Sequence, residues 1–467
     1  MAKGYLPYNI NQRLLLPQDM REWLPEEHLA SFVIDIVSAL DLSAIECVYA
    51  AKDARGRAGY HPAMMVALLV YAYCVGKPSS RRIEQATYDD VAFRVIAADQ
   101  HPDHDSIADF RKRHLAALSG LFLQVLRLCQ KAGLVKLGHV AIDGTKVKAN
   151  ASKHKAMSYQ RMSEAEKKLE EEVALLLAEA ERVDADEDAR YGKGKRIDEL
   201  PKDLKRREDR LKKIREAMGE LEIEAKEKAA AKVAEVAEKV AERAQKEAET
   251  GKKALGPEPK APDPEQAVPD PKAQRNFTDP ESRIMPDGAN KGSFVQSYNA
   301  QIAVDDQAQI IVAAIVVQAA NDVQQLVPMA EAIVVNMGRL ADTTSADAGY
   351  FSAQNVEHPA LAQTNLLVPP PPQKKTTATN AAPAPPLRES ASAAIQMREK
   401  LSGTEGHALY KRRKAIVEPV FGQIKEARGF RRFLLRGIEA VRAEFNFIAL
   451  THNLVKLFRF GGRPVLS

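Results

Sequence analysis

The sequence predicts an α/β protein: a mixed sheet flanked by helices, preceded by an all-α region and interrupted by an inserted helical hairpin or coiled coil. Three observations predict this fold class. Apolar residues recur at helical spacing through residues 1–135. From residue 139 onward, short apolar runs of strand length alternate with helical segments. Between the first such run and the next, two highly charged stretches carry apolar residues seven positions apart, which is the repeat of helices that pack along a seam.

Residues 1–135 are the predicted helical region. The stretch 61–76 is a nearly all-apolar helix with Pro62 near its first turn, and Gly133 stops the last helix. Short helices with basic exposed faces suit a DNA-binding module, and they suit a plain helical bundle equally well. If this region binds DNA, the candidate contacts are Arg81, Arg82, Arg111, Lys112 and Arg113.

The predicted sheet begins with HVAIDGT at residues 139–145. Two apolar runs on either side of the polar turn DDQAQ then indicate a β-hairpin. A helix at 321–338, a short strand in LADTTSADAGYFS, a helix at 352–363 and a short strand at 364–370 follow, and the last block is helical. The order strand, hairpin, helix, strand, helix, strand, helix is that of a mixed sheet with helices packed on it.

A charged segment at residues 158–255 interrupts this sheet, and it is expected to be a helical hairpin. Between residues 202 and 250, 14 basic and 13 acidic residues nearly cancel, which is typical of a salt-bridged exposed helix. The stretch DADEDARYGKGKRIDELPK is expected to join the two helices. Their seven-residue repeats are Met162, Leu169, Leu176 and Val183 in the first, and Leu204, Leu211, Met218 and Ala225 in the second.

The remaining boundaries follow from composition. A proline-rich linker is predicted at 256–272, after the inserted hairpin. The core domain is then split into residues 136–157 and 273–467. Residues 370–400 are predicted to be a low-complexity loop within it.

Charge and composition limit the classes of function. The net charge of the chain is only +5, yet between residues 407 and 463 there are 13 lysines and arginines against four acids. A basic C-terminal block in a nearly balanced chain suggests a polyanionic partner such as nucleic acid, although a solvated helical surface has the same composition.

No apolar run is long enough to predict a membrane span, and the first residues lack the apolar core of a signal peptide. Three scattered cysteines, Cys47, Cys74 and Cys129, are expected to be buried thiols in a reducing cytosol.

Three acids occupy informative places in the predicted order: Asp143 and Asp347 follow strands, and Glu418 lies in the last helical block. A carboxylate at a buried strand end needs a compensating positive charge, which a divalent metal supplies. Two such ions about 3.5–4 Å apart activate an attacking oxygen and stabilise the leaving oxygen at phosphorus. The alternative is that these acids only cap turns. Other acids compete less well, because Asp305 and Asp306 lie in the hairpin turn and Asp322 suits a helix cap.

The sequence resembles the DDE transposases of bacterial insertion sequences, the branch with a ribonuclease-H-like catalytic core. The resemblance lies in AIDGTKVKANAS around Asp143, in SADAGY around Asp347, and in YKRRKAIVEPVFGQIK around Glu418. It also covers the helical block GYHPAMMVALLVYAYCVGKPSSRRIEQATYDDVAFRVIAADQHPDHDSIADFRKRH, which is similar to the end-binding region of that family. One departure concerns the motif around Glu418. Related branches place three residues between the arginine and the glutamate, whereas Arg413 is followed by four, so that Lys414 stands at the other spacing.

The resemblance implies that the three acids are catalytic and bind two Mg²⁺ ions, with Mn²⁺ as a substitute. It implies hydrolysis at the ends of the element, strand transfer into target DNA, double-stranded DNA as the partner, and a homodimer on DNA. No membrane partner and no small-molecule substrate are expected. The supporting and phosphate-binding residues would be Tyr410, Arg413, Lys414, Lys425, Arg428, Lys146 and Lys148. Independently of the resemblance, Arg431, Arg432 and Arg436 in GFRRFLLRG are interleaved with aromatic residues and are further candidate DNA contacts, although such aromatics more often belong to the core.

Helical geometry agrees with part of this assignment. On an ideal helix, Tyr410, Lys414, Glu418, Lys425 and Arg428 fall within about 80° of one another, so the acid would share a face with cations. Pro419 must either kink this helix or lie in its first turn. Lys146 and Lys148 would contact DNA beside Asp143, or else form a solvated strand edge.

Two other functions remain open from the sequence. The first is a catalytically inactive transposase-derived regulator that binds DNA, and its discriminating test is end cleavage with Mg²⁺. The second is a coiled-coil scaffold built on residues 158–250, which leaves the strand-end acids unexplained.

Overall fold

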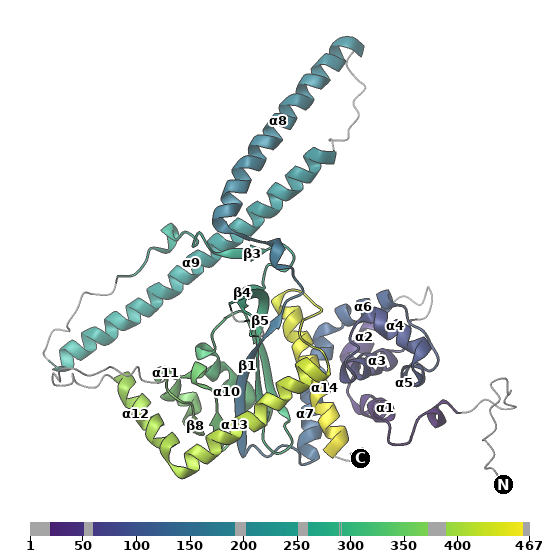
Figure 1. Ribbon diagram of the computed structural model, residues 1–467, viewed down its shortest axis with the longest axis vertical. Helices are drawn as coiled ribbons and strands as arrows, with labels where there is room; N and C mark the ends of the chain where they lie inside the picture. Colours follow the sequence, from purple (N-terminus) through teal and green to yellow (C-terminus); the bar gives the residue numbers. More distant parts are fainter. Residues whose placement is uncertain are drawn as a thin grey trace, which may run out of the picture. The chain divides into compact units, whose positions relative to one another are not determined.

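The computed structural model describes residues 19–50, 59–191, 202–250, 260–288, 290, 292–371 and 389–460 (Figure 1). The chain forms two compact units. The first comprises residues 1–147 and 299–467, and the second comprises residues 148–298. Within the described ranges, no helix is both long enough and apolar enough to cross a membrane.

Short helices open the first unit, as the sequence predicts. Pro62 is at the first position of α3, a helix whose residues from Met65 to Cys74 are all buried. Gly133 has a φ of +71°, the left-handed conformation that ends a helix at low cost. The bounds are η1 Met20–Trp23, α1 Leu29–Ala39, α2 Ser43–Ala50, α3 Pro62–Cys74, α4 Ser80–Asp89, α5 Val91–Ile96, α6 His104–Arg113 and α7 Leu115–Lys131.

A mixed sheet forms the centre of the first unit, which confirms the predicted α/β class. Its strand order is β6-β5-β1-β7-β8. β5 and β6 are antiparallel, whereas β1, β7 and β8 run parallel, with Ala141 opposite Ser345 and Ser345 opposite Leu367. The strands are β1 His139–Lys148, β5 Phe294–Asp305, β6 Ile311–Val317, β7 Thr343–Ser345 and β8 Asn365–Leu367.

The other helices of this unit alternate with the strands. In Figure 1, α13 runs beside β1, and α10 and α11 lie near the β8 side. The bounds are η4 Val323–Gln325, α10 Leu326–Met337, η5 Ala348–Tyr350, α11 Ala353–Val356, η6 Pro359–Leu361, α12 Glu389–Ser402, α13 Thr404–Gly422, a π-helical turn η7 Gln423–Ala427, and α14 Ile438–Phe460.

The C-terminal helix α14 joins the sheet to the N-terminal helices. The side-chain amide of Asn453 accepts from the backbone N–H of Ile311 and donates to its carbonyl, both at 2.8 Å, and so fastens α14 to β6. On the side of the N-terminal helices, the Tyr73 ring packs against Phe447, and Phe32 packs against Phe458. The predicted region 1–135 is therefore part of the same compact unit as the sheet, because α14 buries apolar surface against both.

The predicted loop at 370–400 needs a correction. Residues 389–400 belong to α12, whose Ala393 and Met397 are buried. The segment is rich in residues that favour helix, and the neighbouring α13 gives it a surface to pack on. Residues 372–388 lie outside the described part of the chain.

The second unit confirms the predicted helical hairpin. α8 Tyr159–Tyr191 and α9 Lys202–Thr250 lie side by side as the two longest helices in Figure 1. The first helix continues through residues 184–191, which were predicted to belong to the connection. The side chains of Val183 and Leu204 lie outside the described residues. The buried seam contains Met162, Leu169, Leu211, Ile214, Ala217 and Leu221.

This unit is larger than the predicted insertion at 158–255. It also contains two short ladders, in which β2 Ala156–Ser158 pairs with β3 Gln274–Asn276, and β4 Arg283–Pro286 pairs with the start of β5. Buried Arg275 donates to Glu220 and Glu224, which fastens β3 to α9. Two single-turn helices complete it, η2 Lys153–Lys155 and η3 Pro264–Gln266.

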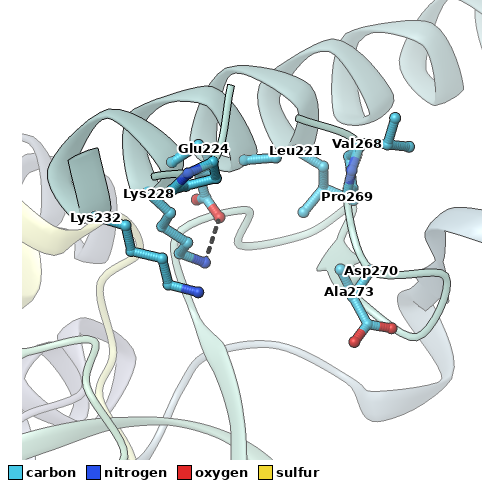
Figure 2. Close-up of a pocket in the computed structure, with 11 residues that line it drawn as sticks. Leu221, Glu224, Lys228, Lys232, Val268, Pro269, Asp270 and Ala273 are labelled. Carbon is cyan, nitrogen blue, oxygen red and sulfur yellow. Dashed lines mark ion pairs between the residues drawn. The ribbon is translucent and has the colours of Figure 1, made fainter. Parts of the chain in front are cut away.

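A shallow hollow of about 260 Å³ lies between α9 and the segment that includes η3 (Figure 2). Figure 2 shows Lys228 paired with Glu224, at 3.9 Å, with Lys232 one turn farther along the helix. The opposite wall contains Val268, Pro269 and Asp270. The hollow has no cluster of acids and is far in sequence from the predicted catalytic residues.

Candidate active site

Asp143 lies in β1, the central strand of the sheet, directly after three fully buried residues. Its Oδ1 accepts from the backbone N–H of Gly144 at 2.8 Å, and its Oδ2 accepts from Nη1 of Arg413 at 3.2 Å. Burial raises the pKa of Asp143, and the nearby charge of Asp347 raises it further, whereas Arg413 lowers it. The carboxyl group is thus held where its charged form is costly and where an additional cation would be favourable.

Asp347 follows β7, the parallel neighbour of β1. It caps the single turn η5 by accepting from the backbone N–H of Gly349 at 2.8 Å. β1 continues to Lys148, so Asp143 lies within this strand and does not follow it, contrary to the prediction. The parallel register of β1 and β7 places Ala141 opposite Ser345, and Asp143 and Asp347 each lie two residues farther along, which explains why Asp347 acts electrostatically on Asp143. The structure therefore brings together two of the three predicted acids.

Arg413 fills the basic position next to Asp143. It is 6% exposed, and its guanidinium lies over the Tyr410 ring at 5.9 Å. Lys414, at the alternative spacing, is exposed on α13. The additional residue between arginine and glutamate therefore does not displace Arg413 from its partner.

Glu418 lies on the exposed side of α13. Within the described residues, no three acidic, histidine or cysteine side chains already surround a point that a metal ion could occupy. The role of Glu418 stays a prediction.

The C-terminal end of this helical block departs from the ideal-helix prediction. Pro419 lies inside α13, and the helix ends in the π-helical turn Gln423–Ala427, which shifts the residues that follow. Lys425 donates to Thr145 Oγ1 at 2.6 Å and to the carbonyl of Lys146 at 2.9 Å, so it fastens the helix to β1.

Arg428 has turned into the protein. It donates to Thr451 Oγ1 at 2.9 Å and to the carbonyl of Ile448 at 3.3 Å, and it lies over the Phe430 ring. Burial lowers the pKa of Arg428 to about 10. The π-helical turn therefore interrupts the ideal helix on which the common face was predicted, and Arg428 bonds to α14.

Asp322 is a fourth acid at the site. Its Oδ1 accepts from Asn299 at 2.6 Å, from Gln301 at 2.7 Å and from Lys146 at 3.4 Å. The sequence favoured a helix cap, but its side chain makes no capping hydrogen bond. The available indication was in β5, where Asn299 and Gln301 interrupt an apolar strand; buried amides at alternate positions require polar partners on the same face.

The predicted basic residues divide into exposed and internal ones. Arg111 is buried and donates to the Pro78 carbonyl at 2.9 Å, so it holds helices together instead of presenting a surface charge. Lys148 belongs to the second unit and pairs with Asp287 at 3.5 Å. The exposed residues of this group are Arg81, Arg82, Lys112, Arg113, Lys414, Arg431, Arg432 and Arg436.

The donors at the site fit a hard divalent cation. Asp143 and Asp347 offer carboxylate oxygens, which Mg²⁺ and Mn²⁺ prefer, and the raised pKa of Asp143 reflects a carboxyl group that lacks full compensation by Arg413. Neither cysteine nor histidine takes part in the contacts described above. The arrangement suits chemistry at phosphorus better than chemistry that needs a soft metal.

Comparison with known families identifies two regions of the chain. Residues 18–113 match a family described as a transposase domain, and residues 374–458 match one described as a transposase DDE domain. The second match contains Glu418 and Arg413, whereas Asp143 and Asp347 lie outside both. Neither the curated proteins nor the solved structures give a match to this chain.

Proposed function

Because the chain belongs to the DDE transposases of insertion sequences, we propose that it binds the terminal repeats of its element, hydrolyses phosphodiester bonds there and transfers the strand ends into target DNA. The observation that carries this proposal is the meeting of Asp143 and Asp347 at adjacent parallel strands, with Arg413 from α13 against the first. These residues come from three distant parts of the chain and meet only in the folded protein.

The sheet supports a ribonuclease-H-like core. An antiparallel pair, β6 and β5, is followed in space by the parallel strands β1, β7 and β8. The acid on the central strand and the acid on its parallel neighbour would both face the edge where DNA is cut. α13, which contains Glu418, lies beside the central strand, as the contacts of Arg413 and Lys425 require.

In this proposal Asp143, Asp347 and Glu418 hold two Mg²⁺ ions, and Mn²⁺ can replace them. When bound, the ions supply the positive charge that activates an attacking oxygen and stabilises the leaving oxygen. Arg413 fixes the orientation of the Asp143 carboxylate through its hydrogen bond to Oδ2. Lys425 keeps the helical block at a constant distance from β1, because its ammonium bonds to both Thr145 and the backbone.

The exposed basic residues form the proposed DNA surface. Arg81, Arg82, Lys112 and Arg113 lie on helices α4 and α6, within the matched transposase domain. Arg431, Arg432 and Arg436 lie between η7 and α14, within the matched DDE domain. Phosphate contacts of this kind give affinity that falls steeply with salt. The element ends and the target would be double-stranded DNA, bound by a homodimer in the bacterial cytoplasm.

The test is nicking of DNA that carries the element's own ends, in the presence and absence of Mg²⁺. We expect the wild type to cut and Asp347→Asn to bind the same DNA without cutting it. Lys136→Gln, which removes an exposed charge before β1, is the matched control. Equal cutting by wild type and Asp347→Asn would remove the catalytic assignment. Binding without cutting by both would favour the inactive regulator.

A further inference from the structure

Lys146 lies among the acids of the candidate site. It is three residues beyond Asp143 on β1, and its Nζ is 3.4 Å from Asp322 Oδ1, in a pair whose side chains are 21% and 24% exposed. Burial lowers the pKa of Lys146, while Asp322, Asp347 and Asp143 each raise it. The ammonium is therefore within electrostatic range of all three carboxylates.

Asp322, the partner of this lysine, is itself held in place by hydrogen bonds. Asp322 is held by the amides of Asn299 and Gln301, and Gln301 in turn accepts a hydrogen bond from the buried Tyr350 hydroxyl. Gly144 completes the arrangement. A Cβ at this position would press on the side-chain amide of Gln301 and lie 3.1 Å from Asp322 Oδ1, so glycine leaves room for these two side chains.

Arg413 alone does not neutralise the negative charges of the three aspartates at the site. Arg413 is committed to Asp143 by its hydrogen bond, which leaves the charges of Asp347 and Asp322 to be offset in another way. Partly buried like charges repel strongly when nothing lies between them. Among the contacts described for the site, Lys146 is the cation whose ammonium pairs with Asp322, and its charge also interacts with that of Asp347.

We propose that Lys146, anchored by Asp322, is an internal cation that holds the acidic site together before a divalent metal binds and gives up this place when the metal arrives. The inference rests on the proposed function in one respect, since it takes Asp143 and Asp347 as metal ligands. It assigns to Lys146 and Asp322 a positioning role that neither a solvated strand edge nor a helix cap would have.

The experiment compares Lys146→Gln with Lys136→Gln, which removes the same charge from an exposed position of the same unit. Mn²⁺ binding is followed by electron paramagnetic resonance, and thermal unfolding is followed in EDTA. We expect Lys146→Gln to bind Mn²⁺ roughly tenfold more tightly than wild type, because a competing positive charge has gone. In EDTA we expect Lys146→Gln to unfold at a lower temperature than Lys136→Gln, because the acids then repel one another.

Lys146→Arg and the double variant Lys146→Gln/Asp322→Asn separate this role from a general loss of packing. Lys146→Arg keeps the charge and should restore both the wild-type Mn²⁺ affinity and the stability in EDTA. The double variant should show non-additive changes, since the two residues act as a pair. Equal behaviour of Lys146→Gln and Lys136→Gln in both measurements would overturn the inference. Absence of Mn²⁺ binding by the wild type would instead reject the proposed function, and with it the displacement of Lys146.

Discussion

At the scale of single residues, two neighbouring arginines in the middle of α13 show how burial changes the cost of breaking an ion pair. Arg412 and Arg413 are neighbours on α13 and both pair with an aspartate. Arg412 is 57% exposed in its side chain, whereas Arg413 is 7% exposed. Removing the arginine should therefore cost little at the exposed position and much more at the buried one, where it leaves an uncompensated carboxylate.

We predict that Arg413→Gln lowers the free energy of unfolding by about 3 kcal/mol, because it leaves the half-buried Asp143 carboxylate without its partner. Arg412→Gln should cost about 0–1 kcal/mol, since solvent screens its pair with Asp306. Urea denaturation in EDTA measures both. Similar losses for the two variants would contradict the internal role of Arg413.

The raised pKa of Asp143 predicts a dependence on pH. Its folded pKa is above the unfolded value, so its contribution to stability is full below the unfolded pKa, about 3.9, and is lost as pH rises through the folded pKa. In EDTA, the stability of wild type should fall across this window, and Asp143→Asn should remove part of the fall. Denaturant unfolding at a series of pH values measures the slope, with Asp347→Asn as the comparison; unchanged slopes in Asp143→Asn would speak against the assignment.

At the scale of elements, α14 determines how the sheet and the N-terminal helices meet. Asn453 replaces a strand neighbour for the backbone of β6, since its amide satisfies both the N–H and the carbonyl of Ile311. Other polar side chains of α14 form single hydrogen bonds in partly buried positions. Asn446, for example, donates to Ser119 Oγ at 3.1 Å in a partly buried position.

We predict that Asn453→Leu lowers the free energy of unfolding by about 2–4 kcal/mol, because it leaves a buried N–H and a buried carbonyl unpaired. Asn446→Ala, on the same helix, should cost about 1 kcal/mol for the loss of one ordinary hydrogen bond. Chemical denaturation provides the comparison. If Asn453→Leu were as stable as Asn446→Ala, α14 would not be held by this contact.

At the scale of the whole molecule, each of the two compact units has a hydrophobic core of its own among the described residues. The first lies around the sheet and α14, and the second is the seam between α8 and α9. Ile214 is 1% exposed within that seam, whereas Ile223, nine residues farther along α9, is 58% exposed. A change in the seam should therefore be felt in the second unit alone.

We predict that Ile214→Ala destabilises the second unit by about 2–4 kcal/mol, through lost burial and the cavity that remains. Ile223→Ala should have an effect within about 0.5 kcal/mol. Amide hydrogen exchange measures the two units separately. Faster exchange in β1 and β7 after Ile214→Ala would show that the cores do not unfold independently.

The sequence by itself determined the periodic features: the helical N-terminal block, the succession of strands and helices along the chain, and the heptad hairpin. These depend on local spacing of apolar residues, which each segment carries regardless of its neighbours. Only the tertiary structure decided that Asp322 and Lys146 meet beside Asp143, that Arg413 and not Lys414 faces this acid, and that Arg428 turns inward. Those outcomes depend on which strands become neighbours in the sheet and on the π-helical turn after Pro419. The spacing of apolar residues within one segment carries no information about which side chain of another segment will contact it.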